Sequence, residues 1–260
     1  MAGARASAQV RPDPSTVTMQ RLSWAGIRLE HAGVAVFIDA TAPNPDAPIK
    51  EAPVATKASR SFALVSHHHG DHFDPEALKP VLGAQGYVVA EEGVARQMNP
   101  QGVLVLPARM YEPVFLSRGA GEFVAWAVPA VDGLGSPQVS WIVDAGGRRI
   151  IHCGDTLWHG GWWSYARAYG PFDVAVLPIN GMRQTSGMYR DVTQPMSLTP
   201  EQAASASKNL GARLTVPVHY GATGNPAYVE QPQAEARFLK AMAALGQTAR
   251  VLAQGEILSL

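Results

Sequence analysis

The sequence contains a single cysteine, Cys153, among its 260 residues. An intrachain disulfide is therefore excluded, which fits a reducing compartment. The sequence also lacks any apolar run of membrane-spanning length, and its first 17 residues lack the apolar stretch of a signal peptide. We therefore expect a cytoplasmic protein without a membrane span.

Charge is scarce and balanced in this chain. Charged residues make up 16% of it, Lys plus Arg number 21, Asp plus Glu number 21, and no basic block is present. Because nucleic acid usually requires a basic surface, we expect no nucleic-acid partner. The hydrophobic content of 47% is typical of a globular protein. The length predicts one domain at residues 17–260 after a flexible tail at 1–16, and leaves a homo-oligomer open.

The apolar pattern predicts strands that come first in each half of the chain, with helices after them. Alternating or continuous apolar runs predict strands near 22–29, 34–38, 61–66, 86–90, 102–107, 122–131, 139–145, 148–154, 172–179, 213–221 and 249–260. Capping residues and periodicity predict helices near 74–82, 92–98, 198–212 and 233–246. Two sheets with helices outside them fit this order best.

The stretch "SHHHGDHFD" at residues 66–74 holds four histidines and two aspartates. It leaves the apolar strand "SFALVS" and precedes a helix that Asp74 and Pro75 would begin. Imidazoles and carboxylates are ligands for Zn, Mn or Fe, and polar groups at the end of a buried strand are costly without partners. A metal site is favoured over the alternative, a solvated histidine-rich loop.

The motif and its context resemble the metallo-β-lactamase superfamily, and the likeness extends over residues 19–260. "HCGDT" is similar to the family's strand end with a metal-bridging aspartate, here Asp155, and "VPVHYG" to the strand that ends in a ligand, here His219. "FIDA" ends at Asp39, where the family often places an aspartate that supports the metal loop. "GDT", "LPING", "LTPEQAA" and "GEILSL" look like the branch of ascorbate-phosphate lactonase and N-acylphosphatidylethanolamine phospholipase D type enzymes.

The resemblance implies an α/β fold of the four-layer αββα type and a centre of two divalent metal ions, zinc first, with manganese or iron as alternatives. His67 and His69 would hold one ion, Asp71, His72 and His219 the other, and Asp155 would bridge them. His68 would point away from the metals.

One departure from the family concerns a third histidine ligand of the first metal. No histidine lies between His72 and His152, and the expected place is occupied by Asp132. Either Asp132 is a ligand, which would favour Mn, Fe or Mg by adding a hard anionic donor, or the first site lacks a ligand and one metal is bound. A second departure is Trp24-Ala25-Gly26, where this branch often has a histidine after the tryptophan.

The two-metal interpretation implies hydrolysis of a small-molecule lactone, ester or amide by a metal-bound hydroxide, with Asp71 as general base. A phosphodiesterase is the first alternative. The second is a non-catalytic metal-binding or ligand-binding protein with a degenerate first site. Two segments, 157–170 and 180–197, are expected to form the substrate pocket because the first is aromatic and the second lacks periodicity. The predicted substrate contacts are His159, Trp162, Arg183, Tyr189 and Arg190, which suit a mostly apolar substrate with one anionic group.

Overall fold

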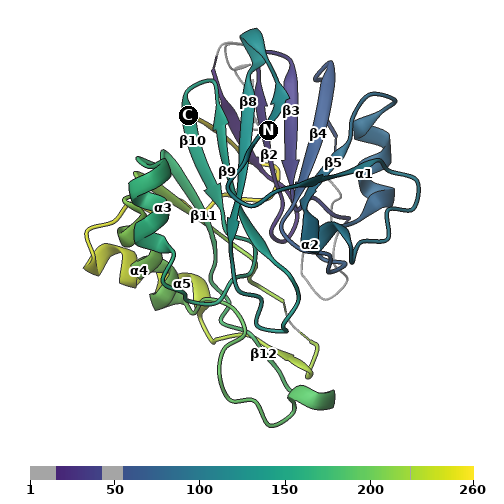
Figure 1. Cartoon of the computed structure of the whole chain (residues 1–260). Helices are drawn as coiled ribbons and strands as arrows, with labels where there is room; N and C mark the ends of the chain where they lie inside the picture. The colour runs from purple at the N-terminus through teal and green to yellow at the C-terminus, as the bar shows by residue number, and fades with distance from the viewer. Residues whose placement is uncertain (1–15, 43–54, 223) are drawn as a thin grey trace, which may run out of the picture.

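Two β-sheets lie face to face, with helices on both outer faces (Figure 1). The computed structural model describes residues 16–42, 55–222 and 224–260. The first sheet has seven strands in the order β15 (Ile257–Ser259), β1 (Thr18–Arg21), β2 (Ile27–His31), β3 (Val34–Ile38), β4 (Arg60–Val65), β5 (Val88–Glu91) and β6 (Val105–Ala108). The predicted flexible tail lies, except for Thr16, outside the described residues.

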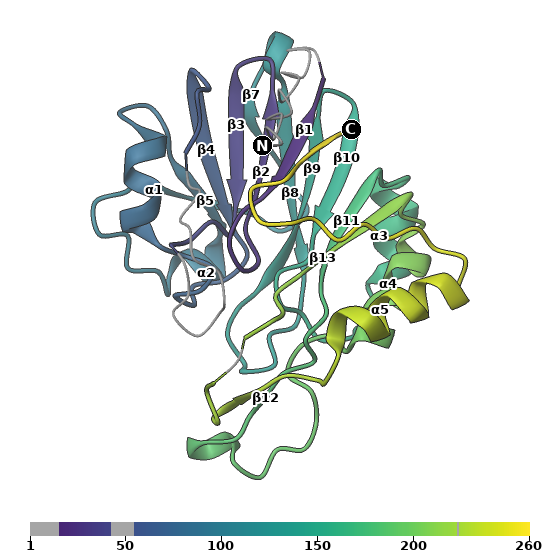
Figure 2. The same ribbon diagram turned by 180° about the vertical axis from the view of Figure 1, so that it is seen from behind.

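The second sheet has six strands in the order β13 (Leu214–Val218), β11 (Val174–Pro178), β10 (Arg148–His152), β9 (Val139–Ala145), β8 (Phe123–Pro129) and β7 (Pro113–Ser117). A separate ribbon pairs β12 (Arg183–Gln184) with β14 (Tyr228–Val229). It extends beyond the two sheets at the bottom of Figure 1. Figure 2 shows the C-terminal segment returning to the first sheet, where β15 pairs with β1.

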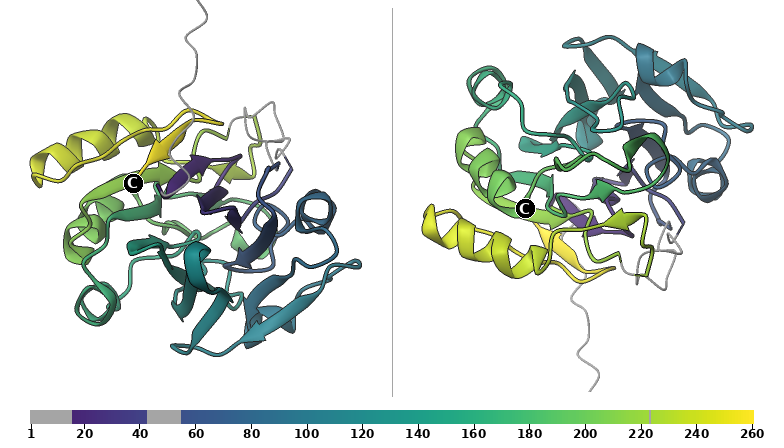
Figure 3. Two further views of the ribbon diagram at one scale, coloured as in Figure 1. Left: turned by 90° about the horizontal axis from the view of Figure 1, so that it is seen from above. Right: turned by 90° about the horizontal axis from the view of Figure 1, so that it is seen from below.

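Three apolar clusters separate the four layers. Leu29, Leu64, Trp141 and Val143 are among the buried residues between the sheets. A second cluster joins the first sheet to α1 (Pro75–Leu82) and α2 (Glu92–Ala95). The third joins the second sheet to α3 (Trp162–Tyr169), α4 (Pro200–Leu210) and α5 (Ala234–Ala244). The views in Figure 3 show the two helix groups on opposite sides of the sheets, and the predicted αββα sandwich is confirmed. None of the described helices has the length and apolar character needed to cross a bilayer.

Local signals explain several of the elements. Thr199 caps α4 in a capping box with Gln202, and Gly211 ends the helix with a φ of +64°. Asp74 caps α1 by accepting hydrogen bonds from two backbone N–H groups of the first turn. The β9–β10 hairpin turns at residues 146–147, as the sequence predicts.

The first strand prediction was wrong in its extent. The apolar pattern places Leu22 and Trp24 in one strand with Ile27, but the backbone turns between β1 and β2, where Leu22 N–H donates to Gly26 C=O. Trp24 has a φ of +36°, in the left-handed region that most residues avoid. The side chain of Trp24 is buried with the cluster between the sheets, and its indole N–H reaches Asp71 in the 66–74 loop.

Helix α3 and strand β7 were not predicted. α3 has no side-chain N-cap and is rich in aromatic residues, which are modest helix formers. The helix is stabilised by tertiary packing, because Trp162 and Tyr165 face the second sheet and are buried in the cluster beneath the helix. The segment 180–197, expected to be irregular, contains β12 and the short 3-10 turn at Gly187–Tyr189.

The topology gathers the ends of several strands at one edge of the sandwich. β3 runs parallel to β4, and β11 runs parallel to both β10 and β13. Their carboxyl ends lead into Asp39, the 66–74 loop, Asp155, Asn180 and His219. Residues far apart in the sequence are therefore brought to one site.

Candidate metal centre

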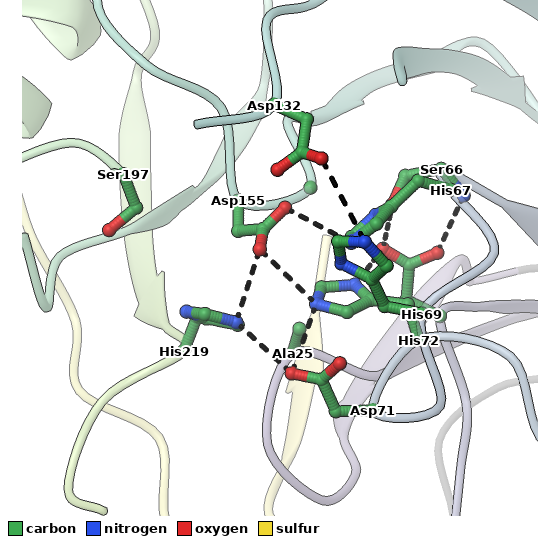
Figure 4. A network of polar contacts seen from close by, with 12 residues as sticks. Ala25, Ser66, His67, His69, Asp71, His72, Asp132, Asp155, Ser197 and His219 are labelled. Atoms are coloured by element: carbon green, nitrogen blue, oxygen red, sulfur yellow. Dashed lines mark hydrogen bonds and ion pairs between the residues drawn. The ribbon is translucent and has the colours of Figure 1, made fainter. Parts of the chain in front are cut away.

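The 66–74 loop and two later strand ends converge on one point (Figure 4). Two groups of side chains have ligand atoms within 4.8 Å of one another: His67, His69 and Asp155, and next to them Asp71, His72 and His219. Except for Asp132, these are the residues that the family resemblance assigns to two metals, with Asp155 as the predicted bridge, and the structure brings them together.

Asp155 lies between the two groups, with one oxygen toward each. Its Oδ1 lies 3.4 Å from His67 Nε2, while its Oδ2 lies 3.6 Å from His219 Nε2 and 3.9 Å from His72 Nε2. A carboxylate in this position can share its two oxygens between two cations, which is the bridging role predicted for it.

Three imidazole nitrogens at the centre lack partners. His67 Nε2, His72 Nε2 and His219 Nε2 are buried and have no hydrogen bond among the described residues. Leaving a buried polar atom unsatisfied costs about 1–3 kcal/mol. Because all three nitrogens face the carboxylates of the site, a divalent cation would satisfy them together, so the residues present fit a metal centre.

Asp39 lies beneath the centre and directs two of its histidines. Its Oδ2 accepts hydrogen bonds from His72 Nδ1 at 2.9 Å and from Ser66 Oγ at 2.6 Å, and its Oδ1 accepts from Ser66 N–H at 2.8 Å. Because the Ser66 hydroxyl hydrogen points to Asp39, its oxygen accepts from His67 Nδ1 at 3.0 Å. In their neutral, metal-binding form both histidines therefore carry their hydrogen on Nδ1 and turn the Nε2 lone pair inward.

The carboxylates of the site favour a positive charge at the centre. Burial lowers the pKa of His72, but Asp71, Asp155 and Asp39 outweigh it and raise that pKa to about 10. Burial opposes ionisation of Asp71, yet the neighbouring His72 and His219 hold its pKa well below the usual range. In the absence of a metal, a proton on His72 provides positive charge among three carboxylates.

In the first group of ligands the pKa of the buried histidine is lowered instead of raised. Burial, followed by the charges of His72 and His69, lowers the pKa of His67 well below its ordinary value. His67 is therefore neutral at physiological pH, which is the form that binds a metal.

Asp132, placed where the family has a histidine, lies next to the first group but has other partners. Its Oδ2 is 3.8 Å from His69 Nε2. Its two oxygens accept hydrogen bonds from the backbone N–H groups of Leu134 at 3.1 Å and Ser136 at 2.7 Å. The Ser136 hydroxyl lies closer to His69 Nε2, at 3.0 Å. The side chain therefore shapes the 132–136 loop, and its role as a metal ligand stays a prediction.

The remaining histidines of the motifs lie outside the two groups. His68 is half-buried and stacks edgewise on His69, with ring centres 5.1 Å apart. His152 is buried, and its Nε2–H donates to Ala25 C=O at 2.8 Å. Its place is structural, because that hydrogen bond ties the turn after β1 to the end of β10.

Trp24 was missed as a site residue. Its indole N–H donates to Asp71 Oδ2 at 3.1 Å, and its ring centre lies 4.6 Å from that of His219. Both contacts act on predicted metal ligands. The departure from the family at residues 24–26 lies in this turn, but nothing in the local pattern shows which way the tryptophan points.

A cavity of about 490 Å³ opens beside the centre. It is lined by Ala42, His69, Gly70, Asp71, Asp74, Leu134, Asp155, Met182, Gln184, Tyr189, His219 and Tyr228. Of the five predicted substrate contacts, Tyr189 is in this lining, where its hydroxyl donates to Leu134 C=O at 3.2 Å. Tyr228 was not predicted, because it belongs to a two-residue strand with no motif around it.

The other predicted substrate contacts do not line this cavity. Trp162 is fully buried in the apolar cluster under α3, because the helix turns that face toward the sheet. His159 stacks on Trp162 with ring centres 4.2 Å apart, on the same side of the molecule. Arg190 is exposed, and Arg183 lies half-buried on the β12–β14 ribbon. Of the aromatic segment after Asp155, Trp162 and Tyr165 belong to the core, whereas Trp158 and Trp163 are exposed.

Comparison with known proteins gives a consistent result. The β-lactamase superfamily domain matches residues 35–220. A UPF0173 metal-dependent hydrolase of Thermococcus kodakarensis is 30% identical over 184 residues, which cover 68% of this chain and 72% of that protein. Another, from Caldivirga maquilingensis, is 27% identical over 249 residues, covering 93% and 99%. Igni18, a metallo hydrolase from Ignicoccus hospitalis, has a similar fold, with a TM-score of 0.71 at 22% identity over 94% of this chain and 98% of that one.

Proposed function

Because the chain belongs to the β-lactamase superfamily of metal-dependent hydrolases, we propose that it hydrolyses a small-molecule lactone, ester or amide at a centre of two divalent metal ions. The observation that carries this proposal is the set of three buried, unpartnered imidazole nitrogens around Asp155. Their orientation is fixed from behind by Asp39 and Ser66.

The ligands of the first ion are His67, His69 and Asp155, with Asp132 as the fourth candidate, and those of the second are Asp71, His72, Asp155 and His219. Zinc suits the imidazoles, and the number of carboxylates leaves manganese or iron as alternatives. Such ions supply Lewis-acid activation of water and of the substrate's carbonyl group.

Asp71 is the candidate general base. Its contacts with Trp24, His72 and His219 all involve Oδ2. The residue lines the cavity, so Oδ1 is left to accept a proton from the attacking water. The low pKa of Asp71 keeps it ionised and able to act as an acceptor.

The lining of the cavity favours an uncharged carbonyl substrate over a phosphodiester. Leu134, Met182 and Tyr189 offer apolar surface, and no Lys or Arg is among the described residues that line it. A phosphodiester would usually be held by a cationic side chain in addition to the metals. The ordered support of His67 and His72 also argues against a degenerate, non-catalytic site. The likeness to the lactonase and phospholipase D branch and a cytoplasmic location are part of the same proposal.

Metal analysis combined with a substrate panel tests the function. The purified protein is expected to hold about two metal ions per chain and to hydrolyse lactones, p-nitrophenyl esters or anilides faster than bis(p-nitrophenyl) phosphate. His219→Ala should lower both metal content and turnover, whereas Asp144→Asn, on the far hairpin, should change neither. Metal binding without turnover of any panel member would contradict hydrolysis, and turnover of the phosphodiester alone would contradict the substrate class.

A further inference from the structure

Tyr228 faces the candidate centre from a part of the chain that carries no family motif. It lies on β14 and lines the cavity together with Asp71, Asp155 and His219. Its ring packs against Trp24, with ring centres 6.3 Å apart. The phenol is thus held beside the predicted reaction site without being a metal ligand candidate.

A buried hydrogen-bond chain fixes the direction in which the phenol donates. Asn180 Oδ1 accepts a hydrogen bond from Ser197 Oγ at 2.5 Å and a longer one from Met182 N–H at 3.4 Å. Met182 N–H also donates to Ser197 Oγ at 3.3 Å. With Oδ1 on this side, the nitrogen of the Asn180 amide points outward, and Nδ2 donates to Tyr228 Oη at 2.7 Å. Asn180 and Ser197 are both fully buried, so this orientation is protected from water.

The phenol consequently accepts from Asn180 and keeps its own hydrogen for another partner. Among the described residues, Asn180 is the one side chain hydrogen-bonded to Tyr228. Burial, followed by the charges of Asp71, Asp155 and Glu230, raises the pKa of Tyr228 well above its ordinary value. The group therefore stays protonated over the whole physiological range.

We infer that Tyr228 is a catalytic residue that donates a hydrogen bond to the carbonyl oxygen of the substrate as this oxygen gains negative charge. The inference rests on the proposed function, because it requires a carbonyl substrate in the cavity.

When the oxygen of water bonds to the carbonyl carbon, the C=O π electrons move onto the carbonyl oxygen. Tyr228 stabilises that oxyanion and keeps its proton; the electrons then re-form C=O, and the bond to the leaving group breaks. The leaving group takes the bonding electrons and the proton that Asp71 removed from water. A donor placed in advance at this position is a large contributor to acyl-transfer catalysis.

Tyr228→Phe removes the donor and keeps the ring. With p-nitrophenyl acetate and the metal-loaded protein, kcat is expected to fall about 100-fold, the usual effect of losing one oxyanion donor. KM should stay within about threefold, because the interaction forms mainly in the transition state. Metal content should equal that of the wild type. Tyr87→Phe is the matched control, since Tyr87 packs on Phe62 outside the cavity and should retain wild-type kcat.

A series of substituted phenyl acetates separates two roles of the phenol. A donor to the carbonyl oxygen should cause the same loss for every leaving group. A loss that grows as the leaving group becomes more basic would overturn the inference, because it would show that Tyr228 protonates the leaving group. A kcat unchanged in Tyr228→Phe would overturn it as well.

Asn180→Asp gives a second variant in which the phenol is retained. The new carboxylate would accept the hydrogen of Tyr228 and turn the donor away from the cavity. It should therefore reproduce the loss in kcat, and the double variant with Tyr228→Phe should be no slower than Tyr228→Phe alone. Additive losses would show that Asn180 acts by another route and would contradict the hydrogen-bond chain.

Calorimetric titration with inorganic phosphate supplies a readout that needs no turnover. Phosphate presents an oxyanion to the metal-loaded cavity, and Tyr228→Phe should weaken its binding about tenfold. If the substitution weakens phosphate binding but the wild type turns over no ester, lactone or amide, the proposed hydrolysis is contradicted, whereas hydrogen-bond donation by Tyr228 into the cavity is supported. If the wild type turns over the substrates normally and the substitution changes neither phosphate affinity nor kcat, only the role of Tyr228 is contradicted.

Discussion

The carboxylate of Asp39 accepts a hydrogen bond from His72 Nδ1 at 2.9 Å, and both side chains are fully buried. The same carboxylate reaches His67 through the hydroxyl of Ser66. One residue at the end of β3 therefore sets the orientation of a histidine in each half of the centre. The two candidate metal positions share a single support.

Replacing Asp39 with asparagine should weaken binding of both metals. The amide oxygen can still accept one hydrogen bond, but the charge that holds the imidazole hydrogens on Nδ1 is lost. Loss of such a supporting group typically lowers metal affinity about 10- to 100-fold. Competition with a chromogenic chelator measures the two affinities.

Ser66→Ala is the partner variant for this test, because it disconnects His67 and leaves the contact between Asp39 and His72. It should weaken the first metal more than the second. Affinities in Asp39→Asn equal to those of the wild type would show that the histidines are held by other groups.

Asp71→Asn should lower turnover more than it lowers metal content. An asparagine oxygen can still accept from the Trp24 indole N–H, so the side chain keeps its place. The proton acceptor is lost, however, and general base catalysis contributes typically about 10²–10⁴-fold in rate. Turnover per bound metal is the quantity to compare. A fall in turnover that matches the fall in metal content would assign Asp71 a ligand role without base catalysis.

The sequence was most informative where function and local structure coincide. The strand before residue 66, the helix beginning after Asp74 and the helix near 198–212 rest on local signals, and each appears in the structure as predicted. The metal motif is a cluster in the sequence because its loop must present several ligands at one strand end. Its grouping into two sets came from the family resemblance, and the structure places Asp155 and His219 beside the motif because both follow parallel strands.

The parts that were missed depend on tertiary contacts. Trp24 reaches Asp71 because the chain turns sharply after β1, and Tyr228 reaches the cavity because β14 pairs with β12. Neither contact leaves a pattern in neighbouring residues. Trp162 was predicted to contact the substrate, but it is buried in the core. The sequence cannot distinguish the two, because a large aromatic side chain suits a core and a pocket equally well.

Asp132→Ala should reduce the metal stoichiometry from about two per chain to about one if the side chain completes the first site. The distance of 3.8 Å from Asp132 Oδ2 to His69 Nε2 places the carboxylate within reach of an ion bound at His69. Elemental analysis after dialysis measures the stoichiometry.

Because Asp132 also holds the backbone of its loop, Ser136→Ala is the control: it removes the hydroxyl near His69 and leaves both backbone hydrogen bonds of Asp132. It should retain two metals. Two metals in Asp132→Ala would limit Asp132 to shaping the loop.

His159 should make the protein lose stability between about pH 6.5 and 4. Burial lowers the pKa of His159 to about 4, whereas the unfolded chain has the ordinary value of 6.5. As pH falls through this window the unfolded state binds a proton first, so the free energy of unfolding decreases. With allowance for the partial exposure of the ring, the loss in the free energy of unfolding by pH 5 is on the order of 1 kcal/mol.

The variant His159→Phe tests this prediction, because it retains an aromatic ring over Trp162 and removes the titration. In EDTA, the wild type should therefore lose about 2–4 °C more in Tm than the variant between pH 7 and pH 5. The lost hydrogen bond to Gly161 N–H shifts the variant equally at both pH values and cancels in this difference. Equal losses in the two proteins would show that the folded state protonates His159 as readily as the unfolded chain does.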